Sequence, residues 1–160
     1  MLDRRNGDEK KKVMVAIDES ECSHYALRWL LENVDSVKDA KLYILTVLPV
    51  ADFGYIYAST LGNTAPELIQ SVQENQRKVA AILLEKAKNI CAEYGIDVET
   101  ISEPGDPKEV ICETADKYNV QLLVVGSHGR NAIKRAFLGS VSNYCVHNAK
   151  CLVLVVKKRT

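Results

Sequence analysis

Residues 122–129 read Leu-Leu-Val-Val-Gly-Ser-His-Gly, and this stretch decides the fold. Four apolar residues in succession, without polar alternation, are typical of a strand that is covered on both faces. The glycine at position 126 then allows the backbone to turn sharply where the strand ends. The stretch therefore predicts a buried strand of a parallel sheet that leads directly into a glycine-containing loop.

Similar apolar runs on both sides of this strand alternate with amphipathic segments. Ser20, Pro66 and Asp106 stand where helices are expected to begin, because serine and aspartate cap helices and proline suits a first turn. Five strands separated by helices predict an α/β fold with an open, five-stranded parallel sheet and helices on both faces. The expected strands are 13–17, 42–47, 98–102, 122–125 and 152–156; the expected helices are 20–34, 66–94, one from 106 that carries Ala115, and 141–147.

Proline and glycine mark the remaining segments. Residues 104–107 read Pro-Gly-Asp-Pro and are expected to form a turn into the third helix. Residues 49–63 hold Pro, Gly, aromatic and small residues, and are expected to form a mobile connection near a site. The long second helix is expected to bury one stripe at helical spacing, formed by Val72, Val79, Leu83, Ala87, Ile90 and Tyr94.

The composition is that of one soluble domain. The chain has 160 residues, of which 47% are hydrophobic and 26% charged, and no apolar run approaches the roughly 18 residues of a membrane span. Residues 1–11 are expected to form a flexible N-terminal tail before a single domain at 12–160. Because the start lacks the apolar segment of a signal peptide, we expect a cytoplasmic protein without membrane contact.

Five cysteines are present, and no two have the C-x-x-C spacing of a redox or metal motif. They are expected to be reduced thiols with a mainly structural role. The open alternative is a redox switch. Cys22 and Cys151 are its candidates because they lie nearest the ends of expected elements.

The net charge of zero hides an asymmetry along the chain. From Lys117 to the C-terminus there are eight Lys and Arg residues and no Asp or Glu, so residues 1–116 carry a compensating charge of −8. A segment whose charged residues are all positive indicates an anionic ligand or partner. The basic residues are sparse and match no nucleic-acid-binding pattern, so nucleic acid is not expected. A phosphate ligand is expected because of the position of this charge relative to the glycine loop, and the open alternative is an ordinary solvated face.

Ligands of open parallel sheets bind beyond the carboxyl ends of the strands, where the strand order reverses. Expected strands end near Asp18, at residues 47–49 and at Gly126, so these positions are expected to meet at one site. The site is thereby located from strand ends alone.

The loop that begins at Gly126 has the spacing G-x2-G-x9-G-S and ends at Gly139 and Ser140. Glycine lets the backbone approach a ligand closely. The free amides and positive dipole end of the following helix suit phosphate oxygens, and the hydroxyls of Ser140 and Ser142 are further donors. The alternative interpretation is an ordinary turn and helix cap. A Walker-A motif is missing, as is a G-x-G-x-x-G after the first strand, which argues against the common P-loop and dinucleotide sites.

These features resemble the universal stress protein family in its single-domain form, of plant or bacterial type. The G-x2-G-x9-G-S spacing matches the family's ATP-binding signature, and the strand that ends in Asp18, the Gly105-x-Pro107 turn and the Val-Val-Gly-Ser-His-Gly-Arg run match as well. Asn131 stands where many members have another small residue, often glycine. The resemblance implies a Rossmann-like fold of the adenine nucleotide alpha hydrolase type, with strand order 3-2-1-4-5.

The resemblance also implies that AMP or ATP binds at this site and assigns roles to its residues. Asp18 would accept hydrogen bonds from the ribose hydroxyls, and the alternative is a capping or turn residue before Ser20. The backbone of Val47 would read the adenine edge, and the alternative is a core residue. Ala16 and Ile17 would line the adenine, Gly126 would lie by the ribose, and Gly129, Arg130, Gly139, Ser140, Val141 and Ser142 would hold phosphates, with Ser127 and His128 in the same loop.

Histidine chemistry is the remaining candidate for catalysis or metal binding. His128 lies in the loop and has a side chain suited to proton transfer near neutral pH, yet the sequence offers it no acidic partner, so no catalytic residue is expected. His24 and His147 lack metal-ligand spacing, so no protein metal site is expected and Mg or Mn would arrive with the phosphates.

The function predicted from these observations is an adenine-nucleotide-binding regulatory protein, with the stress role implied by the resemblance alone. A slow ATPase or phosphoryl-transfer enzyme and a dimerisation module with a vestigial pocket are the open alternatives. The resemblance implies a homodimer through the apolar strand 151–156, unless that strand is an inner one. Signalling partners are expected, but the sequence does not identify them.

Overall fold

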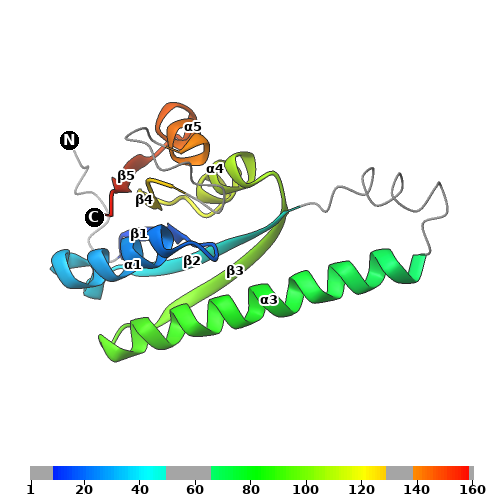
Figure 1. Ribbon diagram of the computed structural model, residues 1–160. Helices are drawn as coiled ribbons and strands as arrows, with labels where there is room; N and C mark the ends of the chain where they lie inside the picture. The colour runs from blue at the N-terminus through cyan, green and yellow to red at the C-terminus, as the bar shows by residue number, and fades with distance from the viewer. Residues whose placement is uncertain (1–8, 50–65, 129–138, 159–160) are drawn as a thin grey trace.

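The computed structural model describes residues 9–49, 66–128 and 139–158, in which strands and helices alternate (Figure 1). Most of the expected tail and all of the expected mobile connection at 49–63 except Pro49 lie outside these ranges, and Pro49 belongs to a strand. In chain order the elements are β1 (Lys12–Ala16), α1 (Glu21–Asn33), a short 3-10 helix η1 (Asp35–Asp39), β2 (Lys41–Pro49), α3 (Pro66–Glu93), β3 (Val98–Gly105), α4 (Pro107–Lys117), β4 (Leu122–Gly126), α5 (Ser140–Asn148) and β5 (Leu152–Val156).

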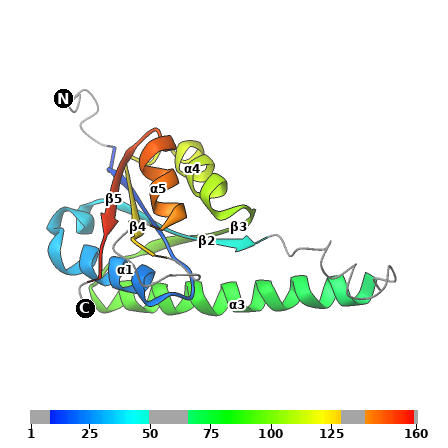
Figure 2. The same ribbon diagram turned by 45° about the horizontal axis from the view of Figure 1, so that its top comes forward.

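The sheet has five parallel strands in the order β3-β2-β1-β4-β5, which confirms the predicted fold class and strand order. The order reverses between β1 and β4, so the switch point lies beyond the carboxyl ends of these two strands. Helices α1 and α3 cover one face of the sheet, and α4 and α5 cover the other (Figure 2).

Two hydrophobic cores, one on each face, explain the uninterrupted apolar strands. Val13 and Val15 of β1 pack with α1 and α3, while Met14 between them packs with α4 and α5. Met14 and Val15 are completely buried. Because both faces are covered, a strand has no solvent-facing side on which polar residues would alternate. The same reason accounts for the apolar runs of β2 and β4.

The second and third strands are longer than predicted. Their pairing runs from Leu42 opposite Val98 to Pro49 opposite Gly105, so residues 104 and 105 belong to β3 and not to a turn. β3 is an edge strand, where a proline can lack its N–H without breaking a ladder on its outer side. The cap of α4 is as predicted, because Oδ1 of Asp106 accepts a hydrogen bond from the Lys108 amide at 3.3 Å.

The long helix α3 buries only part of its predicted stripe. Ala87 and Ile90 are buried, but Val79 is 38% exposed and Ile82, one position from the stripe, is 70% exposed. A 28-residue helix is about 42 Å long, whereas the nine residues of β2 span about 30 Å, so the first turns of α3 extend past the sheet (Figure 1). Gly95 follows the helix with φ +71°, the left-handed conformation predicted for its end. None of the helices in the described ranges combines the length and apolarity needed to cross a membrane.

Candidate functional site

Three strand ends and the start of α5 form the candidate site. Asp18 lies two residues after the end of β1, Val47 is two residues before the end of β2, and Gly126 is the last residue of β4. The amide of Ile17 donates to the carbonyl of Leu45 at 2.8 Å, so the strand pairing continues up to the residue before Asp18. Gly129 and Arg130, two predicted phosphate contacts, lie outside the described residues.

The first turn of α5 presents three amides that the helix itself does not use. Gly139 is the N-cap, and the first intrahelical bond joins the Asn143 amide to the Gly139 carbonyl at 2.9 Å. The amides of Ser140, Val141 and Ser142 precede this bond and have no acceptor within the helix. They stand at the positive end of the helix dipole, an arrangement that attracts anions.

A tight contact holds this helix start against the end of β4. The Gly139 amide donates to the carbonyl of Ser127 at 2.6 Å, and the Ser142 hydroxyl donates to the same carbonyl at 3.2 Å and to that of Gly139 at 3.0 Å. Ser142 is 1% exposed and its hydroxyl bonds to these backbone carbonyls. Of the two donors of Ser142, only its amide therefore remains for the expected contact with phosphate.

The hydroxyl of Ser127 has no hydrogen-bond partner among residues 9–49, 66–128 and 139–158, although its oxygen is buried. Ser127 as a whole is 2% exposed and its amide donates to the carbonyl of Val156 at 3.0 Å. A buried hydroxyl without a partner is unusual in folded proteins and calls for a ligand, a water or a functional reason. His128, the next residue, is half-buried.

Asp18 has a structural role through one of its two carboxylate oxygens. Oδ1 accepts a hydrogen bond from the Ser20 amide at 2.8 Å and another from the Ser20 hydroxyl. Oδ1 of Asp18 therefore has the role of a turn residue, which was the alternative interpretation. Oδ2 forms no bond to any residue in the described ranges. Ser20 in turn caps α1, because its Oγ accepts from the Ser23 amide at 3.3 Å.

Ser23 is a residue of the site that the sequence did not reveal. Its hydroxyl accepts from the Asp18 amide at 3.0 Å and donates to the carbonyls of Asp18 and Ser20 at 3.0 and 3.1 Å. These bonds fix the backbone of Asp18 relative to the first turn of α1. A serine in a first helical turn is too common for its sequence position to predict such a contact.

The backbone of Val47 is directed toward the space beyond β1. β1 ends at Ala16, opposite Leu45, while β2 continues to Pro49. The Leu45 carbonyl accepts from Ile17 and so points toward β1. Because backbone groups in a strand repeat their direction every second residue, the N–H and C=O of Val47 point the same way, past the last residue of β1. Its side chain is half-buried against the core under α4 and α5.

The two described glycines of the loop both stand where a side chain would not fit. A Cβ on Gly126 would lie 2.9 Å from the carbonyl carbon and oxygen of Cys22, at the start of α1. A Cβ on Gly139 would lie 2.8 Å from the carbonyl oxygen of Ser127. Gly126 therefore permits close packing of α1 on β4, a reason different from the close approach of a ligand that the sequence suggested.

Acidification is expected to destabilise the protein partly through His24, on α1. Its Nδ1 is buried and has no hydrogen-bond partner in the part of the chain that the structure describes. Burial lowers the pKa of His24 below its ordinary value of 6.5; the charges of Lys86 and Arg28 lower it further and that of Asp18 opposes them. The unfolded chain then binds the proton more readily, so this contribution to stability is present above pH 6.5 and is lost as the pH falls below it.

Thermal unfolding between pH 7 and pH 5 measures this effect. We expect the melting temperature of the His24→Gln variant to fall less steeply than that of the wild type. His147→Gln, at an exposed position of α5, is the matched control and should follow the wild-type profile. Parallel profiles for wild type and His24→Gln would contradict this account of His24.

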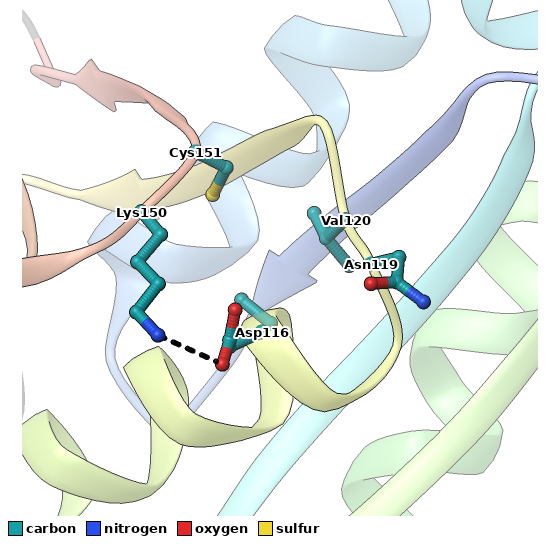
Figure 3. Close-up of a pocket in the computed structure, with 6 residues that line it drawn as sticks. Asp116, Asn119, Val120, Lys150 and Cys151 are labelled. Carbon is teal, nitrogen blue, oxygen red and sulfur yellow. Dashed lines mark hydrogen bonds and ion pairs between the residues drawn. The ribbon is translucent and has the colours of Figure 1, made fainter.

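Figure 3 shows a cavity of about 210 Å³ with its lining residues. The cavity lies at the amino ends of β4 and β5, the opposite end of the sheet from the candidate site. It is lined by residues that precede β4 and β5, among them Val120, Lys150 and Cys151, and by Asp116 of α4, whose carboxylate lies 3.4 Å from Nζ of Lys150. It therefore lies away from the strand ends where ligands of such sheets bind. Within the described ranges, no three His, Cys, Asp or Glu side chains are grouped so that they could hold a metal ion.

Comparisons with known proteins show the family and the fold of the chain. A family model described as the universal stress protein family matches residues 10–157. A universal stress protein A-like protein of Arabidopsis thaliana is 33% identical over 168 residues, which cover 95% of this chain and 93% of that protein. A solved structure of an Arabidopsis thaliana family member with AMP bound is 28% identical, with a TM-score of 0.69 and coverage of 94% of this chain and 93% of that one.

A second solved structure, of a universal stress protein in complex with cAMP, is 25% identical, with a TM-score of 0.66 and coverage of 91% of this chain and 96% of that one. The family model, the Arabidopsis relative and the two structures each match nearly the whole chain. The chain belongs to the universal stress protein family.

Proposed function

We propose that this chain is a regulatory protein that binds an adenine nucleotide, AMP or ATP, beyond the carboxyl ends of β1, β2 and β4. The observation that carries the proposal is the group of amides at Ser140, Val141 and Ser142, which have no acceptor among the described residues, together with the Ser127 hydroxyl, which has no partner there either. Free amides at a helix start favour an anion, and phosphate oxygens would also satisfy the buried hydroxyl. Gly129 and Arg130 would complete the phosphate site.

The nucleoside half of the ligand would lie over the ends of β1 and β2. Oδ2 of Asp18 would accept hydrogen bonds from ribose hydroxyls, because Oδ1 already accepts one from the Ser20 amide. The outward N–H and C=O of Val47 match the donor and acceptor pattern of an adenine edge. Ala16 is half-buried against the core under α4 and α5, so its side chain would offer apolar surface under the base. The side chain of Ile17 is 4% exposed and belongs to the core under α1 and α3, so Ile17 would line the adenine mainly with its backbone.

Relatives support an adenine nucleotide over another anion. One solved relative holds AMP and another is in complex with cAMP. Any Mg or Mn would be bound mainly by the phosphates. The regulatory role in stress is proposed from family membership alone, and a slow ATPase or phosphoryl-transfer activity is the competing proposal.

Calorimetric titration with adenosine, AMP, ADP and ATP tests the proposal. We expect AMP to bind at least about tenfold more tightly than adenosine, since charge-assisted hydrogen bonds to phosphate contribute about 1.5–3 kcal/mol. Equal affinities for AMP and adenosine would contradict a phosphate site on α5. Release of phosphate from ATP that stops in His128→Ala, while binding persists, would favour the enzyme.

We also propose that two copies of the chain pair through β5. β5 is an edge strand, Leu152 is 72% exposed, and the next three residues are apolar and half-buried. Such an edge needs cover, and a second copy supplies it. Sedimentation should show a dimer at micromolar concentration that Leu152→Lys weakens. A monomeric wild-type protein would contradict this pairing.

A cytoplasmic location is part of the same proposal. All five cysteines are unpaired in the structure, as the sequence predicts for a reducing compartment. Expression of a fluorescent fusion in cells tests it directly, with diffuse cytoplasmic signal as the expected result.

A further inference from the structure

Two of the five cysteines face each other between α4 and α5. The Sγ of Cys112 donates a weak hydrogen bond to the Sγ of Cys145 across 3.8 Å. Both helices cover the same face of the sheet. Cys145 is completely buried, whereas Cys112 is half-buried and so reaches the surface. Solvent can therefore reach Cys112 but not Cys145.

The other three cysteines do not share this geometry. Cys91 belongs to the core on the opposite face of the sheet. Cys151 packs against the same core as the pair but lines the separate cavity described above (Figure 3). Among the described residues, Cys112 and Cys145 are the two cysteines whose sulfur atoms form a hydrogen bond with each other. The structure thus favours a different pair from Cys22 and Cys151, which the sequence singled out.

We propose that Cys112 and Cys145 are an oxidation site, where hydrogen peroxide produces a reversible disulfide that cross-links α4 to α5. A disulfide has an S–S distance of about 2.05 Å, so the two sulfur atoms must approach by about 1.7 Å from their present separation. Rotation of the two side chains and a small movement of one helix toward the other supply this approach. The proposal does not depend on nucleotide binding.

The order of events follows from access to the two sulfur atoms. The Cys112 thiolate attacks one oxygen of the peroxide, the O–O bond breaks, and the leaving hydroxide takes a proton to become water. The resulting Cys112 sulfenic acid is attacked by the Cys145 sulfur, the S–O bond breaks, and a second water leaves with the Cys145 proton. Two thiols thus lose two electrons and two protons, and peroxide is reduced to two waters.

The local environment sets the rate of this reaction. Burial raises the pKa of Cys145 to about 12 and also raises the pKa of Cys112 above its ordinary value. Because the thiolate is the reactive form, we expect slow oxidation that requires excess peroxide and proceeds faster as the pH rises. Reduction by dithiothreitol should restore both thiols.

Peptide mass spectrometry after peroxide treatment and alkylation of the remaining thiols tests the proposal. We expect a cross-linked peptide pair that contains Cys112 and Cys145, lighter by two hydrogen atoms than the two reduced peptides together. The bond closes a loop between residues 33 positions apart, so the melting temperature of the oxidised protein should rise by about 5–10 °C.

Three variants separate this site from general oxidation. Cys112→Ser should abolish both the cross-link and the rise in melting temperature. Cys145→Ser should do the same if the variant folds. If Cys145→Ser does not fold, Cys112→Ser still tests the proposal, because Cys112 is only half-buried. Cys151→Ser, in the same layer, is the matched control and should retain both effects. A cross-link through Cys151, or recovery of Cys112 and Cys145 as separately modified thiols, would overturn the proposal.

Discussion

Gly139→Val is expected to abolish nucleotide binding, with a loss in affinity of at least about 100-fold. A Cβ at this position would lie 2.8 Å from the Ser127 carbonyl oxygen and 3.3 Å from the Cα of His128. Both neighbours are backbone, so the start of α5 must move away from β4 and its free amides must leave the phosphate site. Calorimetric titration with AMP measures the loss.

A second glycine provides the control for this variant. Gly95 has φ +71° and nothing within 4 Å of an added Cβ, and it lies at the end of α3, away from the site. Gly95→Ala should cost about 1 kcal/mol of stability, because its backbone conformation disfavours a side chain, but should bind AMP like the wild type. A folded Gly139→Val protein with wild-type affinity would show that α5 does not hold the phosphates.

Asp18→Ala is expected to weaken AMP binding by about 10- to 100-fold, because hydrogen bonds to a charged group contribute about 1.5–3 kcal/mol. The variant loses the proposed ribose acceptor, Oδ2, and also the bond from the Ser20 amide to Oδ1. Titration with AMP gives the affinity, and chemical denaturation gives the accompanying loss of stability.

Ser20→Ala separates these two losses. It removes the Ser20 hydroxyl, which both caps α1 and bonds to Asp18, but leaves the Asp18 carboxylate in place. We expect a loss of about 1 kcal/mol in stability and an affinity for AMP close to that of the wild type. If both variants weakened binding equally, Asp18 would act through the turn alone.

The sheet was predictable because its signals are local. The apolar runs of β1 and β4 each lie between two covering layers, so nearly every residue of these strands is apolar. The end of β3 was not predictable from local signals, because Pro104 and Gly105 are residues typical of a turn. They continue the strand only because β3 lies at the edge of the sheet. The exposure of the first turns of α3 was not predictable either. It depends on the length of α3 relative to the sheet, and the spacing of apolar residues within the helix carries no information about that length difference.

The candidate site was predictable as a place and less so as a set of contacts. Strand ends and the Gly139-Ser140 helix start follow from local patterns. The bonds of the Ser23 and Ser142 hydroxyls to backbone carbonyls do not, nor does the contact of Gly126 with α1, because each joins segments through the folded backbone. Likewise, no sequence spacing predicts the approach of Cys112 to Cys145, which lie on neighbouring helices.

The proposed adenine nucleotide would lie beyond the ends of β1, β2 and β4, with its phosphates on the first turn of α5. Amide chemical shifts of isotope-labelled protein, recorded during titration with AMP, locate the bound nucleotide. We expect the largest shifts on Asp18, Ser127 and residues 139–142. Shifts that instead gather around Asn119 and Lys150, at the cavity on the opposite end of the sheet, or an unchanged spectrum at saturating AMP, would contradict this placement.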